Sequence, residues 1–205
     1  MGSGNGDTVE LIIATRNPGK VEEISRLFAD LSVRISSLLE HPDIPDVVED
    51  GKTFEENAHK KAAAIAGSLG MPALADDSGL LVDYLDGAPG VRSSRYFGPG
   101  LTDQEKVSKL LELLAGVPRS ERTARFHCAA VLVIPGGDWW VTEGSCEGVI
   151  ALQPSGTNGF GYDPVFFVPA LGKTFAELRT VEKETISHRG RAMRLMKDIL
   201  AGLLP

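Results

Sequence analysis

The sequence predicts an α/β fold, in which a mixed β-sheet is flanked by helices. A short apolar, β-branched run at 9–14 leads through a turn into a segment with helical spacing, which is typical of a strand followed by a helix. Two more helices are expected where capping boxes stand, at 53–56 and 102–105. Two β-rich runs, 122–134 and 139–150, are joined by Pro-Gly-Gly-Asp, which favours a hairpin. The sheet therefore contains antiparallel pairs and is not purely parallel.

The first helix has clear start signals. Asn17 is a good N-cap and Pro18 suits the first helical position. Apolar residues then recur at helical spacing, at Val21, Ile24, Leu27, Phe28 and Leu31. A strand is expected at 32–38. The segment 41–52 holds two prolines, several carboxylates and no periodic pattern, so we expect an acidic loop there.

The remaining elements follow from the same local signals. The helix that begins at 53 should end near 68, because Gly70 and Pro72 follow as stop signals. A strand at 73–75 is expected to end in Asp-Asp-Ser-Gly at 76–79, with a further apolar stretch at 80–82. Residues 86–100 carry four glycines and two prolines and are expected to form a loop. A helix at 102–114, a glycine-rich loop at 156–164, a strand at 165–168 and a last helix at 187–203 complete the prediction.

Composition excludes several classes of protein. The 205 residues are 42% hydrophobic and 24% charged, which is typical of a globular chain of one domain, or of two lobes around a cleft. Subtracting 28 Asp and Glu from 21 Lys and Arg gives a net charge of -7, so nucleic acid and anionic membranes are not expected as partners. No apolar run approaches the ~20 residues of a membrane span, and the start lacks signal-peptide features. We expect a cytoplasmic protein, with residues 1–7 as a disordered or vector-derived tail and 8–205 as the domain.

A first candidate site lies between the first strand and the first helix, where Thr15, Asn17 and Lys20 are spaced as Thr-x-Asn-x-x-Lys. Free backbone N–H groups and the positive end of a helix dipole favour an anion at such a turn, and the lysine adds a full charge. The spacing is not that of a P-loop, so P-loop kinases and NTPases lose support. A plain helix cap with a solvated lysine explains these three residues equally well.

A second candidate site is acidic. Glu49 and Asp50 stand in the loop, and Asp76 and Asp77 follow an apolar strand, at the place where open α/β sheets form ligand crevices. Adjacent carboxylates repel unless a cation or proton relieves them, and oxygen ligands of this kind suit Mg²⁺ bridged to substrate phosphates. The absence of a His pair or Cys cluster disfavours zinc. The alternative interpretation is a turn between two strands, for which one Asp suffices.

Two further stretches could recognise a nucleotide base and sugar. In the loop at 156–164, glycines allow close backbone approach, Phe160 and Tyr162 offer flat rings, and Asp163 can bond ribose or base edges. His188 and Arg189 follow a serine at the start of the last helix, where a basic residue favours an incoming anion. The alternatives are a glycine-rich hairpin loop whose aromatics cover the core, and a capped, solvated basic turn. Together with the first two sites, these stretches indicate a nucleotide with a metal.

Taken in order, the motifs ATRNPGK, TFEENAHKKA, PALADDSGL, GAPGVRSSRY, ARFHC, GTNGFGYDPVFF and ISHRG run from residue 9 to about 200. The chain thereby resembles the inosine triphosphate pyrophosphatase family, which hydrolyses non-canonical purine nucleoside triphosphates such as ITP, dITP and XTP. This resemblance implies a mixed, elongated, twisted sheet flanked by helices in two lobes, with a central active-site cleft, and a homodimer. It also implies the reaction, in which a nucleoside triphosphate and water give the monophosphate and pyrophosphate.

The resemblance also implies roles for individual residues. The triphosphate would be held by the turn of Thr15, Arg16, Asn17, Pro18, Gly19 and Lys20, with Lys61 near the scissile phosphate. Glu49 and Asp77 would bind Mg²⁺, or alternatively Mn²⁺, and either Asp77 or Asp76 would be the general base. Substrate contacts would come from Ser78, Phe160, Gly161, Tyr162, Asp163, Lys183, His188 and Arg189.

Selectivity against ATP has a physical basis in this residue set. A 6-oxo purine needs hydrogen-bond donors, which Lys183, His188 or loop N–H groups can supply. A 6-amino purine would leave those donors unpaired, at a cost of ~1–3 kcal/mol each. Two alternatives stay open, namely a pyrophosphatase for other modified or canonical nucleotides and a nucleotide sensor without turnover. The retained carboxylates and lysines argue against the sensor.

Overall fold

The computed structural model describes residues 9–204 and shows an α/β fold around a seven-stranded sheet. The strands run in the order β2-β1-β3-β4-β5-β6-β7. The elements are β1 (Val9–Ile13), α1 (Pro18–Leu27), β2 (Val33–Ser37), α2 (Phe54–Leu69), β3 (Ala73–Val82), α3 (Asp103–Leu113), β4 (Thr123–Val133), β5 (Trp139–Ile150), β6 (Phe166–Val168), β7 (Lys173–Thr174), α4 (Thr180–Ile186) and α5 (His188–Leu203). Strand β1 pairs in parallel with β2 and β3, whereas β6 pairs antiparallel with β5 and β7. The predicted mixed sheet is thus confirmed, while the predicted tail at 1–7 lies outside the described residues.

The chain divides into two compact units, each of which is built from non-contiguous segments. The first unit contains the residues up to Asp77, Ala129–Thr142 and the residues from Ala192 onward. The second contains Ser78–Cys128 and Glu143–Arg191. Strands β3, β4 and β5 and helix α5 each pass from one unit into the other along their length.

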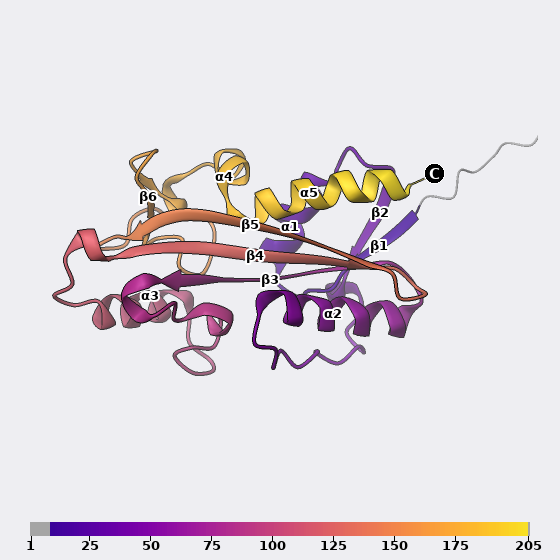
Figure 1. Cartoon of the computed structure of the whole chain (residues 1–205), viewed down its shortest axis with the longest axis horizontal. Coiled ribbons are helices and arrows are strands. Elements are labelled where there is room, and N and C mark those ends of the chain that lie inside the picture. The colour runs from indigo at the N-terminus through magenta and orange to yellow at the C-terminus, as the bar shows by residue number, and fades with distance from the viewer. Residues whose placement is uncertain (1–8, 205) are drawn as a thin grey trace, which may run out of the picture. The chain divides into compact units, whose positions relative to one another are not determined.

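The first unit is a helix–sheet–helix sandwich, with α2 on one face of its strands and α1 and α5 on the other (Figure 1). Ile12 of β1 is fully buried and belongs to one apolar cluster with Ala58, Ala62 and Ile65 of α2. Because alanine side chains are small, α2 can pack closely against the sheet. This close packing brings the polar side chains on the same helix next to β3.

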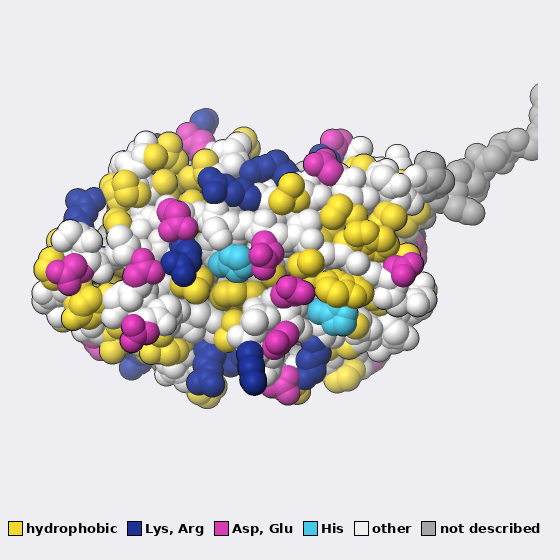
Figure 2. Space-filling model, viewed as in Figure 1, with side chains coloured by type: hydrophobic (Ala, Val, Ile, Leu, Met, Phe, Trp, Pro, Cys, Tyr) yellow, Lys and Arg dark blue, Asp and Glu magenta, His cyan; other side chains and the backbone are white. Residues whose placement is uncertain are grey.

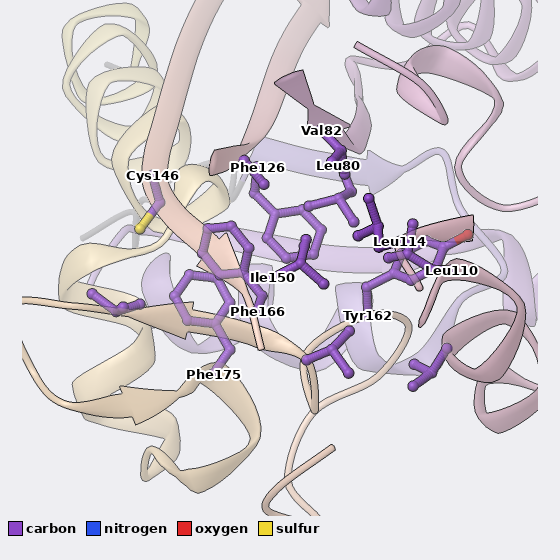
Figure 3. Close-up of a cluster of buried hydrophobic side chains, with 14 of the residues drawn as sticks. Leu80, Val82, Leu110, Leu114, Phe126, Cys146, Ile150, Tyr162, Phe166 and Phe175 are labelled. Atoms are coloured by element: carbon purple, nitrogen blue, oxygen red, sulfur yellow. The ribbon is translucent and has the colours of Figure 1, made fainter. Parts of the chain in front are cut away.

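The second unit has an aromatic core (Figure 3). The ring centroid of Phe166 lies 4.7 Å from those of Phe126 and Phe175, within the range in which aromatic pairs add stability beyond area burial. The ring of Tyr162 packs beside Leu110 of α3, and its hydroxyl donates to the Ser93 backbone oxygen at 3.0 Å. This core supports the glycine-rich loop on which several candidate site residues stand.

The predicted helix starts are confirmed by their caps. The side chain of Asn17 accepts from the Lys20 N–H at 3.2 Å, and Thr102 forms a full capping box. Thr53 accepts from the Glu56 N–H at 3.0 Å, but the Glu56 carboxylate turns back to the Lys52 N–H instead. Local hydrogen bonds therefore mark where α1, α2 and α3 begin.

Three features differ from the sequence-based expectation. Residues 73–82 form one continuous strand, so Asp76 and Asp77 lie inside β3 and not at a strand end or in a turn. Helix α4, with β-branched residues at four of its seven positions, and the two-residue strand β7 were not predicted. Among residues 9–204, no helix has the length and hydrophobicity needed to cross a bilayer.

Candidate active site

The turn between β1 and α1 forms a capped helix N-terminus. Beyond β1, the Thr15 hydroxyl accepts from the Asn17 N–H at 3.2 Å, and Asn17 in turn caps the helix. Pro18 occupies the first helical position, where no N–H is needed. The resulting turn directs the start of α1, and with it Lys20, toward β3.

Arg16, from the same turn, is engaged by the acidic loop. Its guanidinium donates to the backbone oxygens of Leu38 at 2.6 Å and His41 at 3.2 Å, and also to that of Ile44. Its Nε bonds the Asp46 carboxylate at 3.0 Å. The Arg16 side chain therefore ties the turn between β1 and α1 to the loop that carries Glu49.

Asp76 and Asp77 point to opposite faces of β3, because successive side chains of a strand alternate. Asp76 is 1% exposed and pairs with Lys20 of α1 at 3.0 Å. Asp77 is 6% exposed and accepts from the Asn57 amide of α2 at 2.9 Å. Each carboxylate thus has a polar partner on the helix that covers its face, which is what burial of a charge requires.

The two lysines converge on one atom. Lys61 donates to the backbone oxygen of Asp76 at 2.8 Å, and Lys20 reaches the same oxygen at 3.4 Å. Lys61 also pairs with Glu49 at 2.7 Å. Burial opposes the charge on Lys61, but the carboxylates of Asp76, Glu49 and Asp77 outweigh it and raise the pKa, so the ammonium stays charged. The two ammonium groups thus share one backbone oxygen, and each is also paired with a carboxylate.

The donor set fits a hard divalent cation. Burial raises the pKa of Asp77, although Lys61 and the Asn57 amide oppose the shift, and the Glu49 charge adds to it. Three carboxylates (Glu49, Asp76 and Asp77) and two ammonium groups leave the cluster with one excess negative charge, which a divalent cation would reverse. Among residues 9–204, no group of three Asp, Glu, His or Cys side chains is arranged to hold a metal by itself. One or two of these carboxylates nevertheless suffice for Mg²⁺, which commonly takes one or two carboxylates and completes its shell with water and substrate phosphates.

The second unit holds the other predicted residues around a buried ion pair. Lys183 of α4 and Asp163 are 2.6 Å apart, with side-chain exposures of 8% and 4%. Asp163 also accepts from the Phe160 N–H at 3.0 Å. The Lys183 ammonium lies 5.0 Å and the Arg189 guanidinium 5.4 Å from the centre of the Phe160 ring. One aromatic ring is therefore held by two cations from α4 and α5.

The start of α5 positions His188 and Arg189. The Ser187 hydroxyl caps the helix by accepting from the Gly190 N–H at 3.0 Å. Arg189 is 2% exposed and donates to the Ser78 hydroxyl at 2.9 Å, and the His188 ring stacks on Phe126 at 4.7 Å between centroids. Thus Ser78, His188 and Arg189 are fixed by contacts within the second unit.

Two glycines of the loop at 156–164 are required by space and by backbone conformation. Gly156 and Gly159 have φ angles of +82° and +76°, which other residues adopt only with strain. A Cβ on Gly156 would lie 2.3 Å from the Ala176 backbone, and one on Gly159 would lie 1.9 Å from the Asp163 carboxylate. The Gly161 N–H donates to Asp103 at 2.7 Å. The loop is therefore wrapped closely around the Asp163 carboxylate.

Sequence reasoning missed Asn57, which bonds Asp77 directly, although it stands in a motif that was singled out. The available signal was its spacing, because positions four apart lie on one face of a helix and Lys61 follows four residues later. Tyr162 was expected to offer its ring to a base, but the ring lies in the core at 4% exposure.

Comparison with known proteins gives consistent matches. The Ham1 family profile matches residues 11–199. The dITP/XTP pyrophosphatase of Geobacillus kaustophilus is 54% identical over 92% of this chain and 93% of that protein. The dITP/XTP pyrophosphatase of Geobacter sulfurreducens is 53% identical over 93% of this chain and 96% of its own length.

Solved structures of related proteins have the same fold as this chain. A HAM1 protein from Coxiella burnetii superposes with a TM-score of 0.87 at 43% identity, covering 95% of this chain and 99% of that one. A nucleoside-triphosphatase, or dITP/XTP pyrophosphatase, from Mycobacterium abscessus gives a TM-score of 0.75 at 41% identity, covering 92% and 98%. Similarity of this extent spans both units.

Proposed function

Since this chain belongs to the Ham1 family, we propose that it hydrolyses non-canonical purine nucleoside triphosphates such as dITP, ITP and XTP to the monophosphate and pyrophosphate. The observation that carries this conclusion is identity of about half the residues, over nearly the whole chain, with dITP/XTP pyrophosphatases. The chain is accordingly a nucleoside triphosphate pyrophosphatase, and it acts on the bond between the α and β phosphates.

Lys20 and Lys61 are proposed to bind the triphosphate, together with the backbone of the turn at 15–19. Their ammonium groups meet at the Asp76 backbone oxygen, and the pKa of Lys61 is raised by the surrounding carboxylates. Negative charge builds on the leaving pyrophosphate during hydrolysis, and fixed positive charges lower the free energy of that transition state. Arg16 would act differently, by holding the loop at 38–46 beside the turn.

Glu49 and Asp77 are the residues proposed to hold Mg²⁺, with Mn²⁺ as the alternative. When bound, the ion would neutralise phosphate charge and lower the pKa of a coordinated water. Glu49 pairs with Lys61 at 2.7 Å, so the same carboxylate would orient the lysine and supply an oxygen ligand.

Asp77 is the better candidate for the general base. In the metal-free protein, burial raises its pKa, and its carboxylate accepts from the neutral Asn57 amide. The Asp76 carboxylate is fully buried and ion-paired with Lys20, which suits it to positioning that lysine. We therefore assign the proton transfer to Asp77 and the orientation of Lys20 to Asp76.

Recognition of the base is assigned to the residues around the Asp163–Lys183 ion pair. Phe160 is proposed to stack on the purine, because cations on α4 and α5 fix its ring. Lys183 and His188 are proposed as donors to a 6-oxo group, and Arg189, held by Ser78, as a partner for phosphate or sugar oxygens. Asp163 would hold Lys183, while the buried Tyr162 would support the loop and not contact the base.

The protein is further proposed to be a cytoplasmic homodimer. The nucleotide pool that it would clean is cytoplasmic, and the exposed ring of Trp139 on β5, packed against His59 at 4.8 Å, is a surface that a second copy could cover. Light scattering would report the mass of the particle and so the number of copies.

On the face drawn in Figure 2, basic and acidic side chains are intermixed and no stripe of one sign crosses it.

The test is pyrophosphate release from dITP, ITP and XTP beside ATP and GTP, each with Mg²⁺ and with excess chelator. Metal-dependent release from the inosine and xanthosine substrates alone supports both the reaction and the selectivity. Equal release from all five would refute the selectivity, and binding without release would make the chain a nucleotide sensor.

A further inference from the structure

We infer that Asn57 is a positioning residue that locks the acidic loop to the proposed catalytic carboxylate, so that Glu49 and Asp77 keep one fixed arrangement. The Asn57 side chain is fully buried. Its Oδ1 accepts from the Gly51 N–H at 2.8 Å, and its Nδ2 donates to Asp77 Oδ2 at 2.9 Å. This inference rests on the proposed function, because it assigns Asn57 a part in that same reaction.

The two partners of Asn57 determine its chemistry. A backbone N–H can only donate and an ionised carboxylate can only accept, so the bridging group must accept at one end and donate at the other. A carboxamide does both without a charge, and the two partners also fix which end is nitrogen. Aspartate at this position would place two carboxylates against each other, and leucine, of similar size, would make neither bond.

Gly51 supplies the other half of the contact. A Cβ on this residue would lie 2.7 Å from Asn57 Oδ1 and 2.9 Å from the Glu56 Cβ, so the loop backbone comes close only because the residue is glycine. Glu49 stands two residues earlier and reaches Lys61, which is on the same face of α2 as Asn57. Helix α2 therefore holds the loop at four successive residues, through Lys61 to Glu49, Lys60 to Asp50, Asn57 to Gly51 and Glu56 to Lys52, and Asn57 also bonds Asp77.

Such a bridge matters because the reaction depends on geometry. A displacement of about 1 Å in a reacting group can cost ~10²-fold in rate. Substrate binding, in contrast, is assigned to Lys20, Lys61 and the residues around the Asp163–Lys183 ion pair. The two side-chain hydrogen bonds of Asn57 go to Gly51 and Asp77 instead. Loss of the bridge should therefore lower kcat and leave KM nearly unchanged.

The experiment compares Asn57→Asp, Asn57→Leu and Gly51→Ala with wild type, and uses Ile65→Ala as the matched control. Ile65 is buried in the same helix and has no polar side chain, so its truncation destabilises α2 without touching the bridge. Two experiments are made: steady-state kinetics, which gives kcat and KM for dITP at saturating Mg²⁺, and hydrogen exchange of the loop amides at 46–53 without nucleotide or metal.

We expect kcat to fall ~100-fold in Asn57→Asp and Asn57→Leu and ~10-fold in Gly51→Ala, with KM within ~3-fold of wild type and Ile65→Ala near wild type in both. Loop exchange should accelerate in Asn57→Leu and Gly51→Ala but not in Asn57→Asp, which keeps the acceptor. Full activity in Asn57→Asp would show that Asn57 holds the loop but does not position Asp77. Unchanged loop exchange in Asn57→Leu would show that the hydrogen bond to Gly51 does not hold the loop, and would refute the proposed bridge. Wild type without pyrophosphate release would instead refute the proposed function, and the exchange data would still decide whether the bridge exists.

Discussion

Replacing Lys183 by methionine should destabilise the fold strongly, because it leaves the Asp163 carboxylate buried without its cation. The two groups are 2.6 Å apart and have side-chain exposures of 8% and 4%. Removing one partner of a buried pair costs ~3–5 kcal/mol, since the remaining charge keeps its desolvation penalty. For a chain of about this length, each kcal/mol lowers Tm by ~2–4 °C, so the expected loss is ~6–20 °C.

The cause can be separated from lost packing with a second substitution. Asp163→Asn in the Lys183→Met background removes the unpaired charge and keeps an oxygen that can accept from the Phe160 N–H. The double variant should recover at least ~2 kcal/mol of the loss, because the penalty for an unpaired buried charge disappears.

The assay is urea unfolding followed by far-UV circular dichroism, with nucleotide and metal absent. Comparison of four proteins, wild type, both single variants and the double variant, isolates the energy of the pair. A Lys183→Met protein within ~1 kcal/mol of wild type, or a double variant less stable than the single one, would refute the reasoning.

Other outcomes follow from the same site. Asp77→Asn should reduce turnover by ~10²–10⁴-fold while nucleotide binding is retained, and wild-type turnover would exclude it as the base. Burial raises the pKa of Asp77 in the folded state, so ionisation of this carboxyl opposes folding. The protonated carboxyl contributes its full stabilisation below the pKa of the unfolded state. That stabilisation is lost as the pH rises through the pKa of the folded state. The metal-free Asp77→Asn protein should therefore be more stable than wild type at pH 7 and gain nothing near pH 3, as unfolding at both pH values will show. Lys183→Ala should lower the ITP to ATP ratio of kcat/KM by ~5–150-fold, and an unchanged ratio would count against its role as a donor to the base. Lys61→Met should lower kcat with little change in KM, because the Lys61 charge acts mainly on the leaving pyrophosphate. A higher KM with an unchanged kcat would instead assign Lys61 to ground-state binding.

The parts of the fold that the sequence predicts correctly are those decided by local chemistry. Asn17, Thr53 and Thr102 cap helices through side chains that accept from the backbone N–H three residues later. The hairpin turn at 135–138 is likewise local, with the Ile134 N–H bonded to the Asp138 oxygen at 3.0 Å. These contacts need no information from distant parts of the chain.

The parts that were predicted wrongly depend on distant partners. Aspartate is disfavoured in strand interiors, so a pair of aspartates indicated the end of a strand. Lys20 and Asn57, each from another element, stabilise Asp76 and Asp77 within β3, and neither contact follows from the sequence around the two aspartates. In the same way, the loop sequence cannot show whether the Tyr162 ring faces solvent or core.

The candidate site depends on the alternation of side chains along β3. Because Asp76 and Asp77 are adjacent, one faces α1 and receives Lys20, and the other faces α2 and receives Asn57. The register of β3 against β1 fixes this arrangement, since Ile12 and Ile13 pair with Ala73 and Leu74 and β1 leads directly into α1.

A shift of one residue in that register would exchange the two faces and present each carboxylate to the wrong helix. The apolar residues of β1 and β3 that hold the register therefore affect the chemistry through the positions of the two carboxylates. Substitutions that loosen this pairing should lower kcat before they unfold the protein, because two carboxylates with different roles depend on a pairing that a single residue of slippage would invert.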